Sequence, residues 1–147
     1  MTASVTRPVE DVPVKATWDQ LRANPKAILI DVRTRAEWAF VGLADLSSLG
    51  RRPVLVEWLT FPENRLNADF AEQLAGELDT LGADHNSELF FICRSGGRSR
   101  QAAQAMAERG YQLCHNVAEG FEGPLDGTKR RGTQSGWKAE GLPWVQG

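Results

Sequence analysis

The sequence is poor in cysteine, in net charge and in long apolar runs. Its two cysteines, Cys93 and Cys114, are too few for a disulfide framework, and their separation does not match paired zinc ligands, so neither a disulfide scaffold nor a metal site is expected. A formal net charge of -2 argues against nucleic-acid binding, which normally needs a basic surface. No segment approaches the roughly 20 apolar residues of a membrane span, and residues 1–11 lack the apolar region of a signal peptide. We therefore expect a soluble, cytoplasmic protein in a reducing compartment.

The length and composition fit one folded domain. A chain of 147 residues with 41% hydrophobic residues can form one core but is short for two typical domains. The domain is expected to cover residues 1–123, with a core that begins at about Val14. A C-terminal extension over residues 124–147 is expected to pack on the same domain as a clasp that contains Trp137 and Trp144.

Apolar runs alternate with helical patterns along the chain. This alternation predicts an α/β fold with a central, mostly parallel β-sheet, helices on both faces, and ligands at the carboxyl ends of the strands. The predicted strands cover residues 12–15, 27–31, 53–58, 88–92 and 111–117. Two of the predicted helices begin after the N-caps Thr17 and Asn67, and two others cover residues 33–40 and 101–109.

The most informative segment is the loop that begins at Cys93. A buried strand is predicted directly before it, the adjacent Gly96 and Gly97 allow a tight turn, and a helix is predicted after it. Backbone N–H groups of such a loop can turn inward at the positive end of the helix dipole, where they favour a thiolate, a persulfide or a bound oxyanion. Three arginines, Arg94, Arg98 and Arg100, should also favour the thiolate. The pattern predicts a nucleophilic thiol in an anion cradle rather than a merely buried cysteine.

Two motifs of the chain resemble the rhodanese-like sulfurtransferases. One is the cysteine loop, Cys-Arg-Ser-Gly-Gly-Arg at residues 93–98, and the other is Asp-Val-Arg at residues 31–33, followed by Glu-Trp at residues 37–38. The resemblance covers residues 14–123 and implies a single-domain, rhodanese-like fold. The chain departs from the family at residues 41–50, where many relatives have Gly-His-Ile-Pro-Gly-Ala, and this departure bears on the identity of the sulfur acceptor.

The resemblance implies sulfur transfer through a persulfide. As a thiolate, Cys93 would attack the outer sulfur of a small anionic donor such as thiosulfate, and a thiol, cyanide or a sulfur-carrier protein would then remove that sulfur. Arg94 and Arg98 would bind the anionic end of the donor, while loop N–H groups and hydroxyls would stabilise the persulfide. No cofactor is implied, and the physiological donor and acceptor stay open. The predicted substrate-binding residues are Arg94, Ser95, Gly96, Gly97, Arg98 and Ser99.

Two other functions fit part of the pattern. A phosphatase or arsenate reductase would also use a cysteine thiolate in an oxyanion cradle, but tyrosine phosphatases place five residues between cysteine and arginine, and only four separate Cys93 from Arg98. A non-enzymatic rhodanese-like binding module is the other alternative, although inactive modules often lack the cysteine. The intact loop favours the enzyme.

Three further features outside the loop have open or structural interpretations. Asp31 and Arg33 are interpreted as a structural ion pair. Cys114 is interpreted as a packed strand thiol, with sulfur transfer from Cys93 or a disulfide to it as the alternative. The basic cluster at residues 129–131, Lys-Arg-Arg, is either a solvated turn or a device that attracts anions to the Cys93 pocket.

Overall fold

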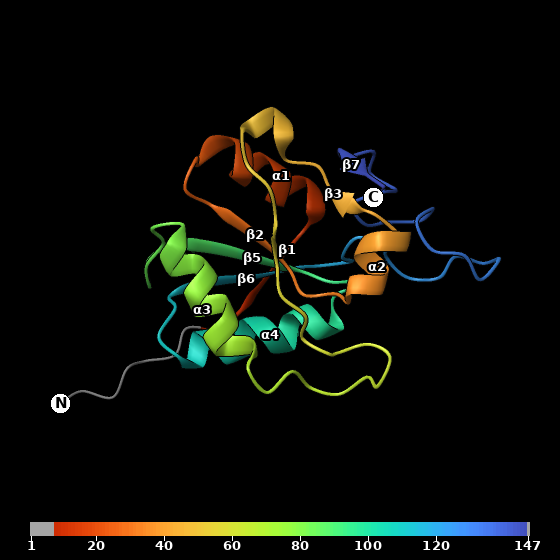
Figure 1. Cartoon of the computed structure of the whole chain (residues 1–147). Helices are drawn as coiled ribbons and strands as arrows, with labels where there is room; N and C mark the ends of the chain where they lie inside the picture. Colours follow the sequence, from red (N-terminus) through yellow and green to blue (C-terminus); the bar gives the residue numbers. More distant parts are fainter. Residues whose placement is uncertain (1–7, 147) are drawn as a thin grey trace.

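Five parallel strands form the centre of the protein. The computed structural model describes residues 8–146, and its main sheet has the order β1-β6-β5-β2-β4 (Figure 1). The α/β fold with a parallel central sheet, predicted from the alternation of strand and helix patterns, is confirmed. The strands of this sheet are β1 (Glu10–Val12), β2 (Ile28–Asp31), β4 (Val54–Leu55), β5 (Glu88–Ile92) and β6 (Leu113–Val117).

Helices cover both faces of this sheet. In Figure 1, α3 and α4 lie on one face and α1 lies on the other, whereas α2 lies beyond the end of the sheet, on the side of the C-terminal segment. Two short strands form a separate antiparallel pair. The bounds are α1 (Val14–Ala23), α2 (Arg35–Phe40), α3 (Phe70–Thr80), α4 (Gly97–Glu108), a short 3-10 helix (Ser47–Leu49), β3 (Leu43–Ala44) and β7 (Trp144–Val145).

The alternation of side chains along β5 divides the core into two layers. Phe90 and Ile92 pack in the layer that includes α1, whereas Leu89 and Phe91 pack in the layer that includes α3 and α4. Cys93 continues the second set and belongs to the α4 layer. The alternation of side chains between the two faces of the strand therefore determines on which face of the sheet the thiol lies.

Several predicted element ends differ from the structure. The first strand, predicted at residues 12–15, is β1 at Glu10–Val12, and α1 already begins at Val14, whose side chain is buried. Thr17 is not an N-cap but lies inside α1, where its hydroxyl donates to the Pro13 carbonyl at 3.0 Å. Of the predicted strand at residues 53–58, only Val54–Leu55 is a strand, and it pairs with β2.

The third helix also begins later than predicted. Its N-cap is Asp69, while Asn67 precedes it and accepts the Asp69 N–H through its side chain at 3.1 Å. Phe70, Leu74 and Leu78 face the core as their spacing predicts. Leu81 lies beyond the last helical turn and is 58% exposed, so its expected contact with the sheet is wrong.

The C-terminal segment lies against the rest of the structure. Trp137 is fully buried, and its indole N–H donates to the Pro143 carbonyl at 2.7 Å. β7 pairs with β3, which places the end of the chain beside the segment that follows α2.

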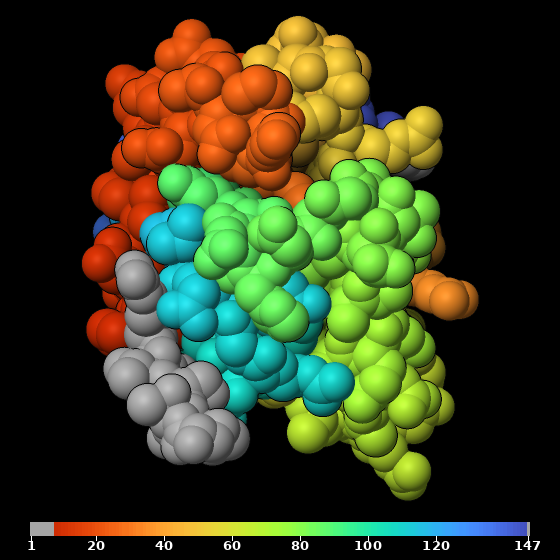
Figure 2. Space-filling model, turned by 90° about the vertical axis from the view of Figure 1, so that its left-hand side faces the viewer, coloured from red at the N-terminus to blue at the C-terminus, as the bar shows by residue number. Residues whose placement is uncertain are grey.

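The opposite end of the molecule, at the amino ends of the strands, is shown in Figure 2. Within residues 8–146, no helix is long and apolar enough to cross a membrane.

Candidate active site

The candidate site begins where β5 ends. Cys93 directly follows Ile92, and the loop then enters α4 at Gly97. Gly96 is the N-cap of α4 and has a φ of 109°, a conformation that residues with a side chain rarely adopt. A glycine at this position therefore allows the chain to turn from the strand into the helix within three residues of the thiol.

The sulfur of Cys93 lies among hydrogen-bonding groups at the start of α4. The Gly96 backbone N–H donates to Cys93 Sγ at 3.1 Å, and the Ser99 Oγ lies 3.2 Å from the same sulfur. The residue is only 1% exposed. A backbone donor and the positive end of a helix dipole together favour a negative charge on the sulfur.

A turn after β6 holds the other side of the loop. The Cys93 carbonyl accepts the Phe121 N–H at 2.8 Å, and the Arg94 carbonyl accepts N–H groups of Glu122 and Gly123. A Cβ atom at Gly120 would lie 2.5 Å from the Cys93 carbonyl oxygen, so only glycine fits there. These bonds turn two carbonyl oxygens of the loop toward residues 120–123 and satisfy them there. The sequence patterns did not predict this contact with the site.

Arg98 is held by a carboxylate from α2. Its two terminal nitrogens donate to the two oxygens of Glu37 at 2.7 and 2.9 Å. Glu37 also forms a capping box with Thr34 at the start of α2. Glu37 therefore connects α2 to the cysteine loop. The predicted contact of Arg98 with the donor stays a prediction, since this conformation uses both terminal nitrogens in the ion pair.

The Glu37–Arg98 pair should make stability depend on pH. Burial alone would raise the pKa of Glu37, but the hydrogen bonds and charge of Arg98 outweigh burial and lower that pKa below its ordinary value of 4.5. The pair therefore contributes stability that is present above about pH 4.5 and is lost as the pH falls through the folded-state pKa. We expect Glu37→Gln to lower the urea midpoint at about pH 7 and to have a much smaller effect at about pH 3. An equal loss at both pH values would contradict this account.

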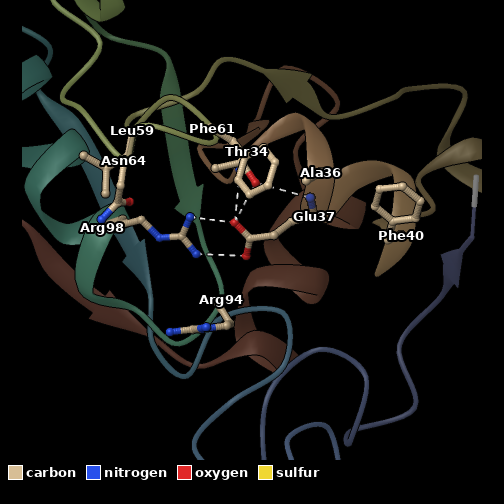
Figure 3. Close-up of a pocket in the computed structure, with 9 residues that line it drawn as sticks. All are labelled: Thr34, Ala36, Glu37, Phe40, Leu59, Phe61, Asn64, Arg94 and Arg98. Atoms are coloured by element: carbon tan, nitrogen blue, oxygen red, sulfur yellow. Dashed lines mark hydrogen bonds and ion pairs between the residues drawn. The ribbon is translucent and has the colours of Figure 1, made fainter.

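A pocket opens beside the cysteine loop. Its volume is about 580 Å³, and Figure 3 shows the Glu37–Arg98 pair at its centre. Arg94 lies on one side of this pair and Phe61 on the other, with Phe40 at the far end. Arg94 forms no ion pair with any other residue that the structure describes. It is therefore the cation best placed to meet an anion in the pocket.

The hydroxyls of the loop differ in position. Ser95 is exposed, and within the described part of the chain its side chain makes no hydrogen bond. Ser99 is fully buried and lies within 2.5 Å of Asn116 Oδ1 as well as near the Cys93 sulfur. Asn116 Nδ2 in turn donates to Asp11 Oδ1 at 3.0 Å. Sequence reasoning missed Asn116 and Asp11, since they lie on β6 and β1 and only the strand order brings them next to α4.

The Asp31–Arg33 pair is fully enclosed beside the site. Arg33 donates to both oxygens of Asp31, at 3.0 and 2.6 Å, and to the Gly42 carbonyl at 2.7 Å. The side chains of Arg33 and Asp31 are 0% and 2% exposed. The guanidinium also lies 4.3 Å from the ring centre of Phe121. This geometry agrees with a structural role, because a buried charge needs its partners.

The other two predicted features lie apart from the sulfur. Cys114 is a free, buried thiol on β6, and burial raises its pKa to about 12. In the basic cluster, Lys129 and Arg130 are exposed, whereas Arg131 donates to the Gly123 carbonyl at 2.8 Å. Attraction of anions by this cluster stays a prediction.

Comparison with known proteins supports the family relationship. A family model described as "Rhodanese-like domain" matches residues 15–124. The chain belongs to this family. The rhodanese-like chain is 34% identical to the uncharacterized protein RC0915 of Rickettsia conorii over 136 residues, which cover 92% of this chain and 97% of the relative.

Solved structures share this rhodanese-like fold. The crystal structure of Rv0390 from M. tuberculosis has a TM-score of 0.85 and 43% sequence identity, with coverage of 96% of this chain and 100% of that chain. The polysulfide-sulfur transferase homodimer of Wolinella succinogenes has a TM-score of 0.58 and 20% identity, with coverage of 95% and 80%, so it supports the fold alone.

Proposed function

We propose that this rhodanese-like protein is a sulfurtransferase. It moves a sulfane sulfur from a donor such as thiosulfate to a thiophilic acceptor, either cyanide or a thiol, through a persulfide on Cys93. The observation that carries the proposal is the position of the Cys93 sulfur, which accepts the Gly96 N–H at 3.1 Å at the start of α4. A sulfur atom held at a helix N-terminus is favoured as an anion, and a thiolate is the nucleophile that sulfur transfer needs.

The first step loads the enzyme. The Cys93 thiolate attacks the outer sulfur of thiosulfate, a new S–S bond forms, and the S–S bond of the donor breaks, so that sulfite leaves with the electron pair. The product is a persulfide anion on Cys93. The Gly96 N–H can stabilise that anion as it stabilises the thiolate, because both carry their charge on sulfur close to the loop.

The second step regenerates the thiolate. Cyanide or a thiolate acceptor attacks the outer sulfur of the persulfide, and the Cys93 thiolate leaves with the electron pair. With cyanide the product is thiocyanate. Arg94 binds the anionic end of the donor, while Arg98, whose charge is balanced by Glu37, holds α2 against the cysteine loop. The attacking species in this mechanism is the thiolate itself, so no general base takes part in the transfer step.

Initial rates test this proposal. With thiosulfate and cyanide as substrates, we expect thiocyanate to form and double-reciprocal plots at several cyanide concentrations to give parallel lines, since the two substrates react in separate steps. Intersecting lines would mean that both substrates must bind together, and the persulfide route would be wrong. Absence of thiocyanate with either cyanide or a thiol as acceptor would favour a binding module.

A further inference from the structure

The inference concerns the C-terminal extension, residues 124–147, and rests on the proposed function. The turn at residues 120–123 lies between this extension and the cysteine loop. On one side, N–H groups of the turn donate to the carbonyls of Cys93 and Arg94 at 2.8 to 3.1 Å. On the other side, each of the four carbonyls of the turn accepts a donor from the extension. These donors are the backbone N–H groups of Gly132, Trp137 and Lys138 and the guanidinium of Arg131.

The extension crosses the turn at a separation that excludes side chains. Gly136 has a φ of 101°, and a Cβ atom there would lie 2.8 Å from the Gly123 nitrogen and 3.1 Å from the Gly120 carbonyl oxygen. A Cβ atom at Gly123 would in turn overlap the carbonyl of Ser135. Beside this crossing, the ring of Trp137 is fully buried. The extension therefore fixes the position of the turn from the side opposite the cysteine loop.

The turn sets the direction of two N–H groups of the loop. In a planar trans peptide the N–H points opposite to the C=O, and the peptides after Cys93 and Arg94 are both trans. Because these two carbonyls point to the turn, the N–H groups of Arg94 and Ser95 point away from it. Neither N–H has an acceptor among the residues that the structure describes. They are free donors next to the Gly96 N–H, which already donates to the Cys93 sulfur.

We propose that the C-terminal extension positions the sulfur site, with Gly136 as the positioning residue. The extension holds the turn, the turn holds two loop carbonyls, and the N–H groups of Arg94 and Ser95 then face the sulfur anion that forms on Cys93. Donors that are already oriented need no reorganisation when charge develops, so their displacement slows the step. A domain that ended at residue 123 would lack the donors to all four carbonyls of the turn.

Gly136→Ala tests the inference in the full chain. The added Cβ displaces the turn, so we expect the single-turnover rate constant of sulfite release at saturating thiosulfate to fall about tenfold. The thiosulfate concentration at half saturation should stay the same, because Arg94 still supplies the charge that meets the donor. Gly141→Ala is the matched control, since Gly141 also has a positive φ in the extension but a Cβ atom there would have no atom within 4 Å. Its rate constant should stay within about twofold of the wild type.

A destabilised variant separates positioning from stability. Leu21→Ala opens a cavity at the C-terminal end of α1, which leads into the start of β2 and lies away from the turn. It should lower the urea midpoint but leave the rate constant of the folded protein unchanged. If Gly136→Ala lowers only the urea midpoint, or if Leu21→Ala slows sulfite release equally, the extension only stabilises the fold and the inference is wrong. If the wild type itself transfers no sulfur, both proposals fail.

Two substitutions in the basic cluster decide the question if Gly136→Ala does not fold. Arg131→Met removes the donor to the Gly123 carbonyl. Arg130→Met removes the same charge from an exposed side chain that makes no hydrogen bond within residues 8–146. At a salt concentration that screens the attraction of anions, we expect the rate constant of Arg131→Met to fall about threefold and that of Arg130→Met to equal the wild type. Equal rate constants in the two variants would overturn the inference.

Discussion

Replacement of Cys93 by serine is expected to reduce thiocyanate formation by at least about a thousandfold, to the level of the uncatalysed reaction. The hydroxyl of serine is similar in size to a thiol and can accept the Gly96 N–H, so the loop should keep its conformation. It is a far weaker nucleophile toward sulfur than a thiolate. The loss should therefore appear in kcat and not as a loss of folded protein, which urea denaturation would check.

Cys114→Ala provides the matched control for this loss. Cys114 is the other cysteine, but burial raises its pKa to about 12, so it stays a neutral thiol at physiological pH. The variant should keep its activity within a few-fold of the wild type, with a modest loss of stability from the removed packing. Equal losses in the two variants would show that sulfur passes through Cys114 and would contradict an account based on Cys93 alone.

The second large effect is expected on stability. Arg33→Met should lower the free energy of unfolding by about 3–5 kcal/mol, because the change leaves the buried Asp31 carboxylate without its partner. The change also removes the donor to the Gly42 carbonyl, which anchors the chain after α2. Urea denaturation monitored by tryptophan fluorescence measures this loss.

An exposed ion pair on α1 gives the comparison. Arg22 pairs with Asp19, and the two side chains are 56% and 63% exposed. Arg22→Ala should change the free energy of unfolding by less than about 1 kcal/mol, since water and salt screen such a pair. Similar effects of the two substitutions would mean that the enclosure of Arg33 does not determine its contribution.

The site was predictable wherever local sequence determines local structure. The apolar strand, the two glycines and the following helix place Cys93 at the end of β5 and at the start of α4, as the structure has them. The ion pair of Asp31 and Arg33 followed from their closeness in sequence. In each of these cases the interacting groups lie within a few residues of one another.

Contacts between distant segments could not be predicted. Glu37 and Arg98 are 61 positions apart, and their pairing depends on how α2 lies against the loop. Asn116 meets Asp11 because β6 and β1 are neighbours in the sheet, an order that the sequence patterns do not contain. The close approach of Gly120 to the cysteine loop likewise depends on the path of the chain after β6.

The intact mass of the protein tests the central claim most directly. Wild type and Cys93→Ser are incubated with thiosulfate, measured, treated with cyanide and measured again. We predict that the wild type alone gains the mass of one sulfur atom and that cyanide removes it as thiocyanate. A gain on both proteins would place the sulfur elsewhere in the chain. No gain on the folded wild type, with thiosulfate or with an organic persulfide as the donor, would contradict the proposed sulfurtransferase.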